Sequence, residues 1–225
     1  MMSNAQTLKP ASSTLGWGSA IVLGFIVPAI GISYLAQSPD SASVLVALPM
    51  TLALSVMGAT LIAAATDGRL WVGIVVGLGV LIALALLASA LGLRVSLSPV
   101  LTILAAVLAS LSFAARGSLF ARSAEGRGWL IALGVLAGES AVVLSSLIDP
   151  DLWPGWLLAL LPAQWASLAF KAALTGTTAL APLLALGGTA MATLFVVQMW
   201  PRRWTYGIMF GVWLGLSALV YHTNF

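Results

Sequence analysis

Hydrophobic residues fill this chain in long runs, and polar residues are confined to short stretches between them. Seven runs are long enough to cross a hydrocarbon core of roughly 30 Å as helices that rise about 1.5 Å per residue. They cover Gly16–Ala36, Ser43–Thr66, Leu70–Leu93, Leu97–Ala115, Gly128–Ile148, Ala172–Trp200 and Trp204–Tyr221. The pattern therefore predicts an all-α fold, a polytopic transmembrane helix bundle of seven spans.

The stretch Asp151–Lys171 does not fit this pattern, because it contains Pro154, Pro162 and three tryptophans. Proline removes a backbone donor and clashes with the preceding turn, so a straight helix through Pro162 is not expected. Two readings remain open, namely a kinked eighth span or a Trp/Pro-rich interfacial or re-entrant segment. The seven-span reading places more Lys and Arg on one side of the membrane, and we prefer it for that reason.

The connections between the runs are short, so there is no room for a folded domain outside the membrane. Met1–Leu15 is rich in Ser, Thr and Asn, and the sequence predicts a disordered cytoplasmic tail there. The remaining residues, 16–225, are expected to form a single transmembrane domain. A helix that contains Pro182 is expected to be interrupted at that residue.

Composition agrees with a membrane protein, since 61% of the 225 residues are hydrophobic and only 7% are charged. The net charge of +3 is spread over helix ends without a basic patch, so nucleic-acid binding is not predicted. Basic residues hold loops in the cytoplasm, which predicts a cell inner-membrane protein with a cytoplasmic N-terminus. Seven basic residues fall on that side, and Arg94 and Lys171 fall on the other. The seven are Lys9, Arg69, Arg116, Arg122, Arg127, Arg202 and Arg203.

The candidate functional residue is Glu139, a single carboxylate near the middle of the run Gly128–Ile148. A charge at the bilayer centre costs roughly 2.5–3.5 kcal/mol on insertion scales, so its presence calls for an explanation. The sequence places no basic residue at a similar depth, and we expect a neutral carboxylic acid that faces the bundle interior. One explanation is a hydrogen bond to a hydroxyl of a neighbouring helix, for which the run Ala172–Trp200 offers Thr175, Thr177, Thr178, Thr189 and Thr193. The other is a proton relay or a contact with a ligand, with Ser140, Lys171 and Gln164 as possible supporting polar residues.

Glycines spaced four apart indicate helix faces that allow close approach of a neighbouring helix. The last run contains Gly207, Gly211 and Gly215, and Glu139 lies beside the pair Gly134 and Gly138. A similar pair, Gly73 and Gly77, lies in the third run. We expect these faces to pack within the chain, with an oligomer or partner interface as the alternative.

The residue types present exclude several kinds of chemistry. Cysteine is absent and histidine occurs once, so cysteine ligands and multi-histidine metal sites are excluded, and no cofactor is predicted. No catalytic motif is evident, and an enzyme is not expected. The first function hypothesis is a permease or permease subunit that moves a small solute or ion, coupled to protons through Glu139. The alternative is a non-catalytic anchor or assembly subunit, with the lipid bilayer and a second copy or other membrane subunits as partners.

Overall fold

The computed structural model of the chain describes residues 9–37, 41–93, 98–124 and 126–224, and these residues form helices and connecting turns without a strand. A continuous first helix comprises α1 (Lys9–Ile21), the π-helical turn η1 (Val22–Ile26) and α2 (Val27–Leu35). The further helices are α3 (Ser41–Asp67), α4 (Leu70–Ala90), α5 (Pro99–Ser123), α6 (Gly128–Ile148), α7 (Gly155–Ala159), α8 (Pro162–Thr175), α9 (Leu180–Gln198) and α10 (Trp204–Asn224).

Seven helices within the described residues are long and apolar enough to cross a membrane. They are the first helix from Ser13 to Leu35, α3 from Ser43, α4, α5, α6, α9 and α10. The all-α, multi-pass architecture predicted from the hydrophobic runs is therefore confirmed. Helices α7 and α8, in the Trp/Pro-rich stretch, have only 5 and 14 residues.

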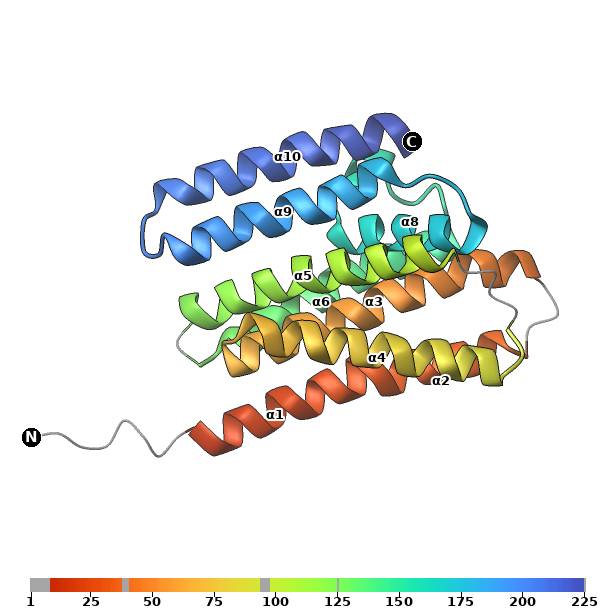
Figure 1. The fold of residues 1–225 in the computed structure, drawn as a ribbon, viewed down its shortest axis with the longest axis horizontal. Helices are drawn as coiled ribbons and strands as arrows, with labels where there is room; N and C mark the ends of the chain where they lie inside the picture. The colour runs from red at the N-terminus through yellow and green to blue at the C-terminus, as the bar shows by residue number, and fades with distance from the viewer. Residues whose placement is uncertain (1–8, 38–40, 94–97, 125, 225) are drawn as a thin grey trace, which may run out of the picture.

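Helix α3 forms the centre of the bundle, and it packs against the first helix and against α4, α5, α6 and α8. Small side chains make this close packing possible, since Ala53, Ala59, Ala63 and Ala64 of α3 are fully buried. Helices α9 and α10 form a hairpin on the far side of α5, while α1 and α2 lie along the opposite side of the bundle (Figure 1).

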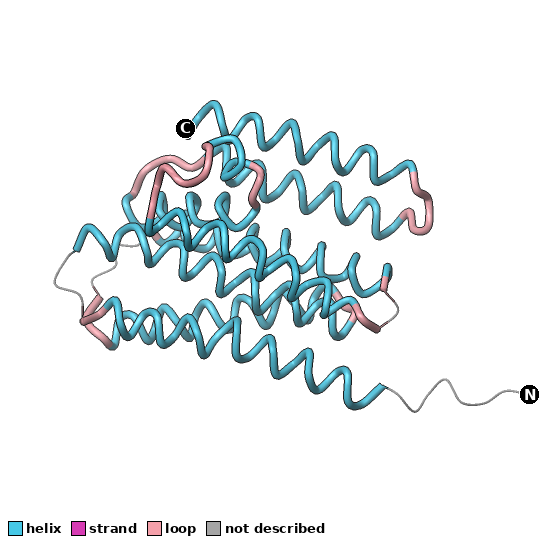
Figure 2. Tube along the Cα trace, turned by 180° about the vertical axis from the view of Figure 1, so that it is seen from behind, coloured by secondary structure: helices cyan, strands magenta, loops and turns pink. Residues whose placement is uncertain are grey.

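The long helices run side by side, so their ends gather at two opposite ends of the bundle (Figures 1 and 2). One end holds the start of α1 and the α3–α4, α5–α6 and α9–α10 connections. The last of these includes a cis peptide bond between Trp200 and Pro201. The other end holds the C-terminus of α10 and the connection from α6 to α7.

Two helices extend well beyond their predicted ends. The first helix begins at Lys9, within the stretch predicted to be a disordered tail, and residues 1–8 lie outside the described residues. Helix α5 continues past Ala115 to Ser123, so Arg116 and Arg122 are helical and not in a loop. The prediction ended this helix at its first charged residue, whereas no residue between Arg116 and Ser123 breaks a helix and Arg116 faces the protein interior.

The predicted long helix Ala172–Trp200 is divided into α8 and α9. Gly176 ends α8 with a positive φ of 70°, a left-handed conformation that glycine adopts without steric cost. Pro182 lies in the first turn of α9, where an N–H group has no partner within the helix anyway. The predicted interruption at Pro182 was therefore wrong, and the break falls before it.

Candidate functional site: a cavity between Arg116 and Glu139

A cavity of about 330 Å³ lies between α5, α6, α9 and α10, beside the first residue of α8. Both Arg116 of α5 and Glu139 of α6 line it, together with two threonines of α9. The other lining residues are Leu119, Phe120, Val135, Pro162, Met209, Phe210 and Trp213. A basic and an acidic side chain thus share a cavity whose remaining walls are mainly apolar and aromatic.

Arg116 is held from two sides. Its guanidinium carbon lies 5.6 Å from the ring centre of Phe113, a fully buried residue one turn earlier in α5. Its Nη2 donates a hydrogen bond of 3.3 Å to Oγ1 of Thr189 on α9. The Thr189 hydroxyl donates in turn to the carbonyl of Ala185 at 2.7 Å, which leaves its oxygen free to accept from Arg116. The other terminal nitrogen, Nη1, is buried and has no hydrogen-bond partner among the described residues.

Glu139 contacts the N-terminus of α8. Its Oε2 accepts a hydrogen bond of 2.8 Å from the backbone N–H of Ala163, which follows Pro162 in the first turn of that helix. Leu161 at the N-cap position has no side chain that can accept this bond. A carboxyl group from a neighbouring helix therefore caps α8, and the positive end of the helix dipole favours the ionised form of that group.

This contact explains why the chain can turn in the middle of the bundle. The segment from Asp149 reaches α7, turns at Leu160 and Leu161, and continues as α8 beside the middle of α6. The indole of Trp165 donates to the carbonyl of Ala159 at 2.7 Å and ties the two short helices together. The backbone N–H of Ser98, before α5, then bonds to the carbonyl of Ala173 at 3.0 Å near the end of α8.

Arg116 and Glu139 interact electrostatically across the cavity. No nitrogen of Arg116 lies within 4.0 Å of a carboxyl oxygen of Glu139, so the two residues do not form a direct ion pair. The ion pair found among the described residues joins Arg69 and Asp67 at 3.7 Å. The sequence-based expectation that Glu139 has no basic residue at similar depth was therefore wrong. It failed because Arg116 was placed in a loop, whereas the apolar residues that follow it, such as Leu119 and Phe120, indicate that the helix continues.

The expected hydrogen bond between Glu139 and a threonine is not observed either, since Glu139 bonds to the backbone N–H of Ala163 instead. Thr189 and Thr193 do line the same cavity. Of the supporting polar residues, Ser140 lines a separate groove, Lys171 is exposed, and Gln164 is buried near the start of α8. The Oε1 atom of Gln164 has no hydrogen-bond partner among the described residues. The structure thus brings none of these three side chains into the cavity with Glu139.

The glycine pairs behave in two different ways. A Cβ atom added to Gly73 would lie 2.7 Å from the carbonyl oxygen of Thr60, so this glycine permits close packing of α4 on α3. By contrast, the structure places no atom of another helix within 4 Å of such a Cβ at the glycines beside Glu139 or on α10. These are Gly134, Gly138, Gly207, Gly211 and Gly215. Their predicted packing role is not observed within the described chain, and an interface with another chain stays a prediction.

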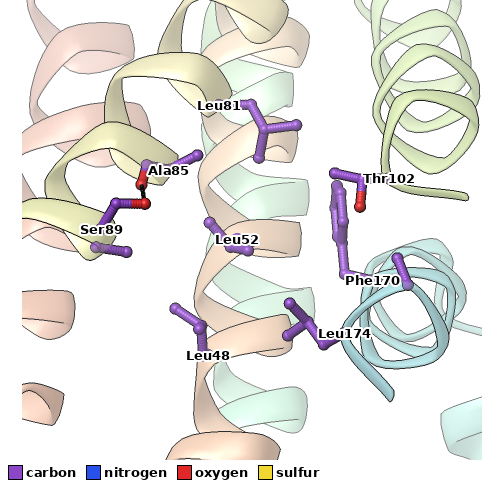
Figure 3. A pocket seen from close by; sticks show the side chains of 10 residues that line it. Leu48, Leu52, Leu81, Ala85, Ser89, Thr102, Phe170 and Leu174 are labelled. Atoms are coloured by element: carbon purple, nitrogen blue, oxygen red, sulfur yellow. Dashed lines mark hydrogen bonds between the residues drawn. The ribbon is translucent and has the colours of Figure 1, made fainter. Parts of the chain in front are cut away.

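Two other cavities have a simpler character. A cavity of about 40 Å³ lies between α3, α4, α5 and α8, where Leu48, Leu52, Leu81 and Phe170 converge (Figure 3). The hydroxyl of Ser89 on its rim is already bonded to the carbonyl of Ala85 at 2.9 Å. A groove of about 480 Å³ along α2, α3 and α6 is lined mainly by apolar residues and contains no charged residue. Such apolar surfaces are what an acyl chain contacts, and they offer no chemistry.

The cavity between Arg116 and Glu139 brings hydrogen-bond donors and a titratable acceptor together. Arg116 supplies donors in a planar fork that fits a carboxylate or phosphate, and Glu139 supplies an acceptor that can also carry a proton. Comparison with known proteins finds no matching family model, no similar curated protein and no similar solved structure. The geometry of this cavity is therefore the basis on which the function is proposed.

Proposed function

We propose that this protein is a small permease, or the membrane subunit of one, that moves a small solute or ion in a process coupled to protons at Glu139. The observation that carries the proposal is the placement of Arg116 and Glu139 around one cavity without a direct ion pair. A buried charge that is not fully paired is costly, and ionisable residues within membrane helices mark ion and substrate pathways.

The depth of the cavity supports transport. Glu139 lies near the middle of α6, and Arg116 lies about two turns before the end of α5. Both positions fall well inside a hydrocarbon core of roughly 30 Å. A binding site close to the midplane is the arrangement expected of a secondary transporter.

The broken helix pair α7–α8 gives a second reason. We place it as a re-entrant segment that enters and leaves at the same membrane face. Helix α8 begins at Pro162, where the N–H of Ala163 bonds to Glu139 beside the middle of α6, and it ends near Ser98, at the start of α5. Discontinuous helices whose N-termini point at a site are a recurrent feature of transporters, and such irregular backbone is tolerated at membrane depth when it is buried in protein.

We place the protein in the cell inner membrane with its N-terminus in the cytoplasm. Arg116 no longer counts as a loop residue, yet six basic residues still fall at the end that holds the N-terminus, against Lys171 at the other among the described residues. Cytoplasmic loops carry this kind of excess. The six are Lys9, Arg69, Arg122, Arg127, Arg202 and Arg203.

Proton movement in reconstituted liposomes tests this function. Purified protein is incorporated into liposomes loaded with a pH-sensitive dye, and separate pools of amino acids, sugars, nucleosides and organic anions are added outside. At least one pool is expected to drive proton entry with the wild type and not with Glu139→Gln. Asp151→Asn, which neutralises an exposed acid outside the cavity, should behave as the wild type does. Proton entry no faster than in protein-free liposomes for all four pools would rule the proposal out.

The second candidate is a non-catalytic subunit that anchors or assembles a larger membrane complex. It is favoured by the open glycine face of α10, at Gly207, Gly211 and Gly215, which has the spacing of a helix–helix interface. Purification in mild detergent followed by mass measurement tests it. A partner chain that is retained by the wild type and lost with Gly211→Leu would favour this function, whereas a monomer would exclude it.

A further inference from the structure

The charges around the cavity have spare hydrogen-bonding capacity. Arg116 uses Nη2 to bond Thr189, while its buried Nη1 has no partner among the described residues. Glu139 uses Oε2 to bond the N–H of Ala163, and its Oε1 accepts no bond from any described residue. Glu139 can therefore accept a further charge-assisted hydrogen bond from a molecule in the cavity, and the guanidinium of Arg116, which lines the same cavity, has a donor that no described residue uses.

The balance of charge limits what such a molecule can be. Among the cavity-lining residues, all of which are described, Arg116 and Glu139 are the two charged ones. A simple anion would pair with Arg116 but would bring a like charge towards Glu139, and a simple cation would meet the opposite problem. A molecule that carries an anionic and a cationic group close together satisfies both residues and adds no net charge to a site between membrane-spanning helices.

The walls define the rest of the molecule. Phe120, Phe210 and Trp213 contribute aromatic surface, and Leu119, Val135 and Met209 contribute aliphatic surface. An apolar body packed there is stabilised by removal from water, as in most small-molecule sites. The volume of about 330 Å³ lies at the lower end of the range of about 300–1,000 Å³ for such sites, so the molecule is small.

We propose that this cavity binds a zwitterion with an apolar body, with its anionic group on Arg116 and its ammonium group on Glu139. A free α-amino acid with an apolar side chain carries this chemistry, and so does the headgroup of an aminophospholipid. This inference rests on the proposed function, because it names the class of substrate that the permease takes. It also connects the two residues in a single event, since one molecule contacts both.

Calorimetry tests the inference by measuring how tightly the purified full chain binds leucine and two of its analogues. The analogue 4-methylpentanoate lacks the ammonium group, and 3-methylbutylamine lacks the carboxylate. Leucine is expected to bind at least tenfold more tightly than either analogue, a difference of about 1.4 kcal/mol. Equal binding of leucine and one analogue, or binding of none of the three together with a negative lipid result, would overturn the proposal.

Variants assign each end of the ligand. Arg116→Gln should weaken leucine binding at least tenfold and leave the binding of 3-methylbutylamine unchanged. Glu139→Gln should also weaken leucine binding at least tenfold and leave the binding of 4-methylpentanoate unchanged. Asp151→Asn serves as the control, since it lies outside the cavity. If either cavity variant fails to fold, the comparison of the three ligands on the wild type still decides the matter.

Lipid binding distinguishes the second source of the same chemistry. Mass spectrometry of protein extracted from bilayers of phosphatidylethanolamine and phosphatidylcholine should show selective retention of the former if a headgroup occupies the cavity. Arg116→Gln should abolish that selectivity, and retention of both lipids alike would count against the lipid source. Proton entry driven by sugars or nucleosides would reject the zwitterion as the ligand and still support the permease function. Leucine binding without any flux would support the zwitterion as the ligand and reject the permease function.

Discussion

At the scale of single residues, Glu139 stabilises a helix end and also lines the cavity. It caps α8 through the N–H of Ala163, and it faces Arg116 across the cavity. The importance of Glu139 is evident from the sequence, because a lone acid in an apolar run has few explanations. Its partners are not evident, because a backbone N–H has no sequence signature and because Arg116 resembles a loop residue until the extent of α5 is known.

Substitutions can separate the capping of α8 by Glu139 from its acidic chemistry. Glu139→Ala removes the acceptor that caps α8 and should lower the free energy of unfolding by about 1–2 kcal/mol, the usual effect of losing a cap. Glu139→Gln keeps an acceptor oxygen and should lose less than half of that. Thermal unfolding followed by the fluorescence of the nine tryptophans measures both. Equal losses for the two variants would show that the cap is not what Glu139 contributes to stability.

Arg122 gives a second prediction at this scale. Its Nη1 donates a hydrogen bond of 2.9 Å to the carbonyl of Val197 in the last turn of α9, where the helix dipole favours a cation. Arg122→Ala should destabilise the protein by about 0.5–1 kcal/mol, and Arg203→Ala, an exposed residue beyond that helix, should have no measurable effect. Identical unfolding temperatures for the wild type and Arg122→Ala would contradict this account.

At the scale of elements, the hydrophobic runs predict the long helices well, and Gly128–Ile148 is confirmed at both ends. The broken part of the chain is predicted less well. Gly176 divides the predicted helix Ala172–Trp200 because it can adopt a positive φ, but most glycines in this chain lie inside helices and do not break them. The sequence does not mark which of its glycines adopts this conformation and ends a helix.

The same limit applies to the glycine pairs. Gly73 packs against α3, whereas Gly138 has the same spacing and meets open space. Spacing describes a helix face, and the placement of the neighbouring helix decides whether that face is covered. The sequence therefore predicts surfaces that could be covered, and not which of them are.

Alanine substitutions test this difference directly. Gly24→Ala would place a Cβ 2.7 Å from backbone atoms of Ala59, so it should destabilise the bundle by about 1–3 kcal/mol through overpacking. Gly211→Ala meets nothing within 4 Å and should stabilise the isolated chain by about 0.5–1 kcal/mol, because alanine is the better helix former. Thermal unfolding in one detergent compares the two, and a destabilised Gly211→Ala would show that α10 packs against another chain.

At the scale of the whole molecule, the composition predicts a membrane protein, and the helices confirm a multi-pass architecture. Function at this scale depends on how the bundle lies in the membrane. The proposed re-entrant course of α7 and α8 places Asp151 and Thr177 at the same face, whereas an eighth span would place them at opposite faces.

The absence of cysteine makes this arrangement easy to measure, because a single introduced thiol has no background. Asp151→Cys and Thr177→Cys replace exposed residues, and both should react with a membrane-impermeant maleimide added to intact cells. Ser123→Cys, at the opposite end of α5, should react only after the membrane is opened. Labelling of Asp151→Cys and Thr177→Cys from opposite sides would establish an eighth span.

The central claim is that the cavity between Arg116 and Glu139 couples solute movement to protons. Its most direct test uses the solute that drives proton entry and compares wild type and Glu139→Gln in the same liposomes. The account predicts that Glu139→Gln still exchanges solute across the membrane without a gradient but no longer accumulates it when the outside is acidified. Accumulation by Glu139→Gln equal to that of the wild type would contradict the account.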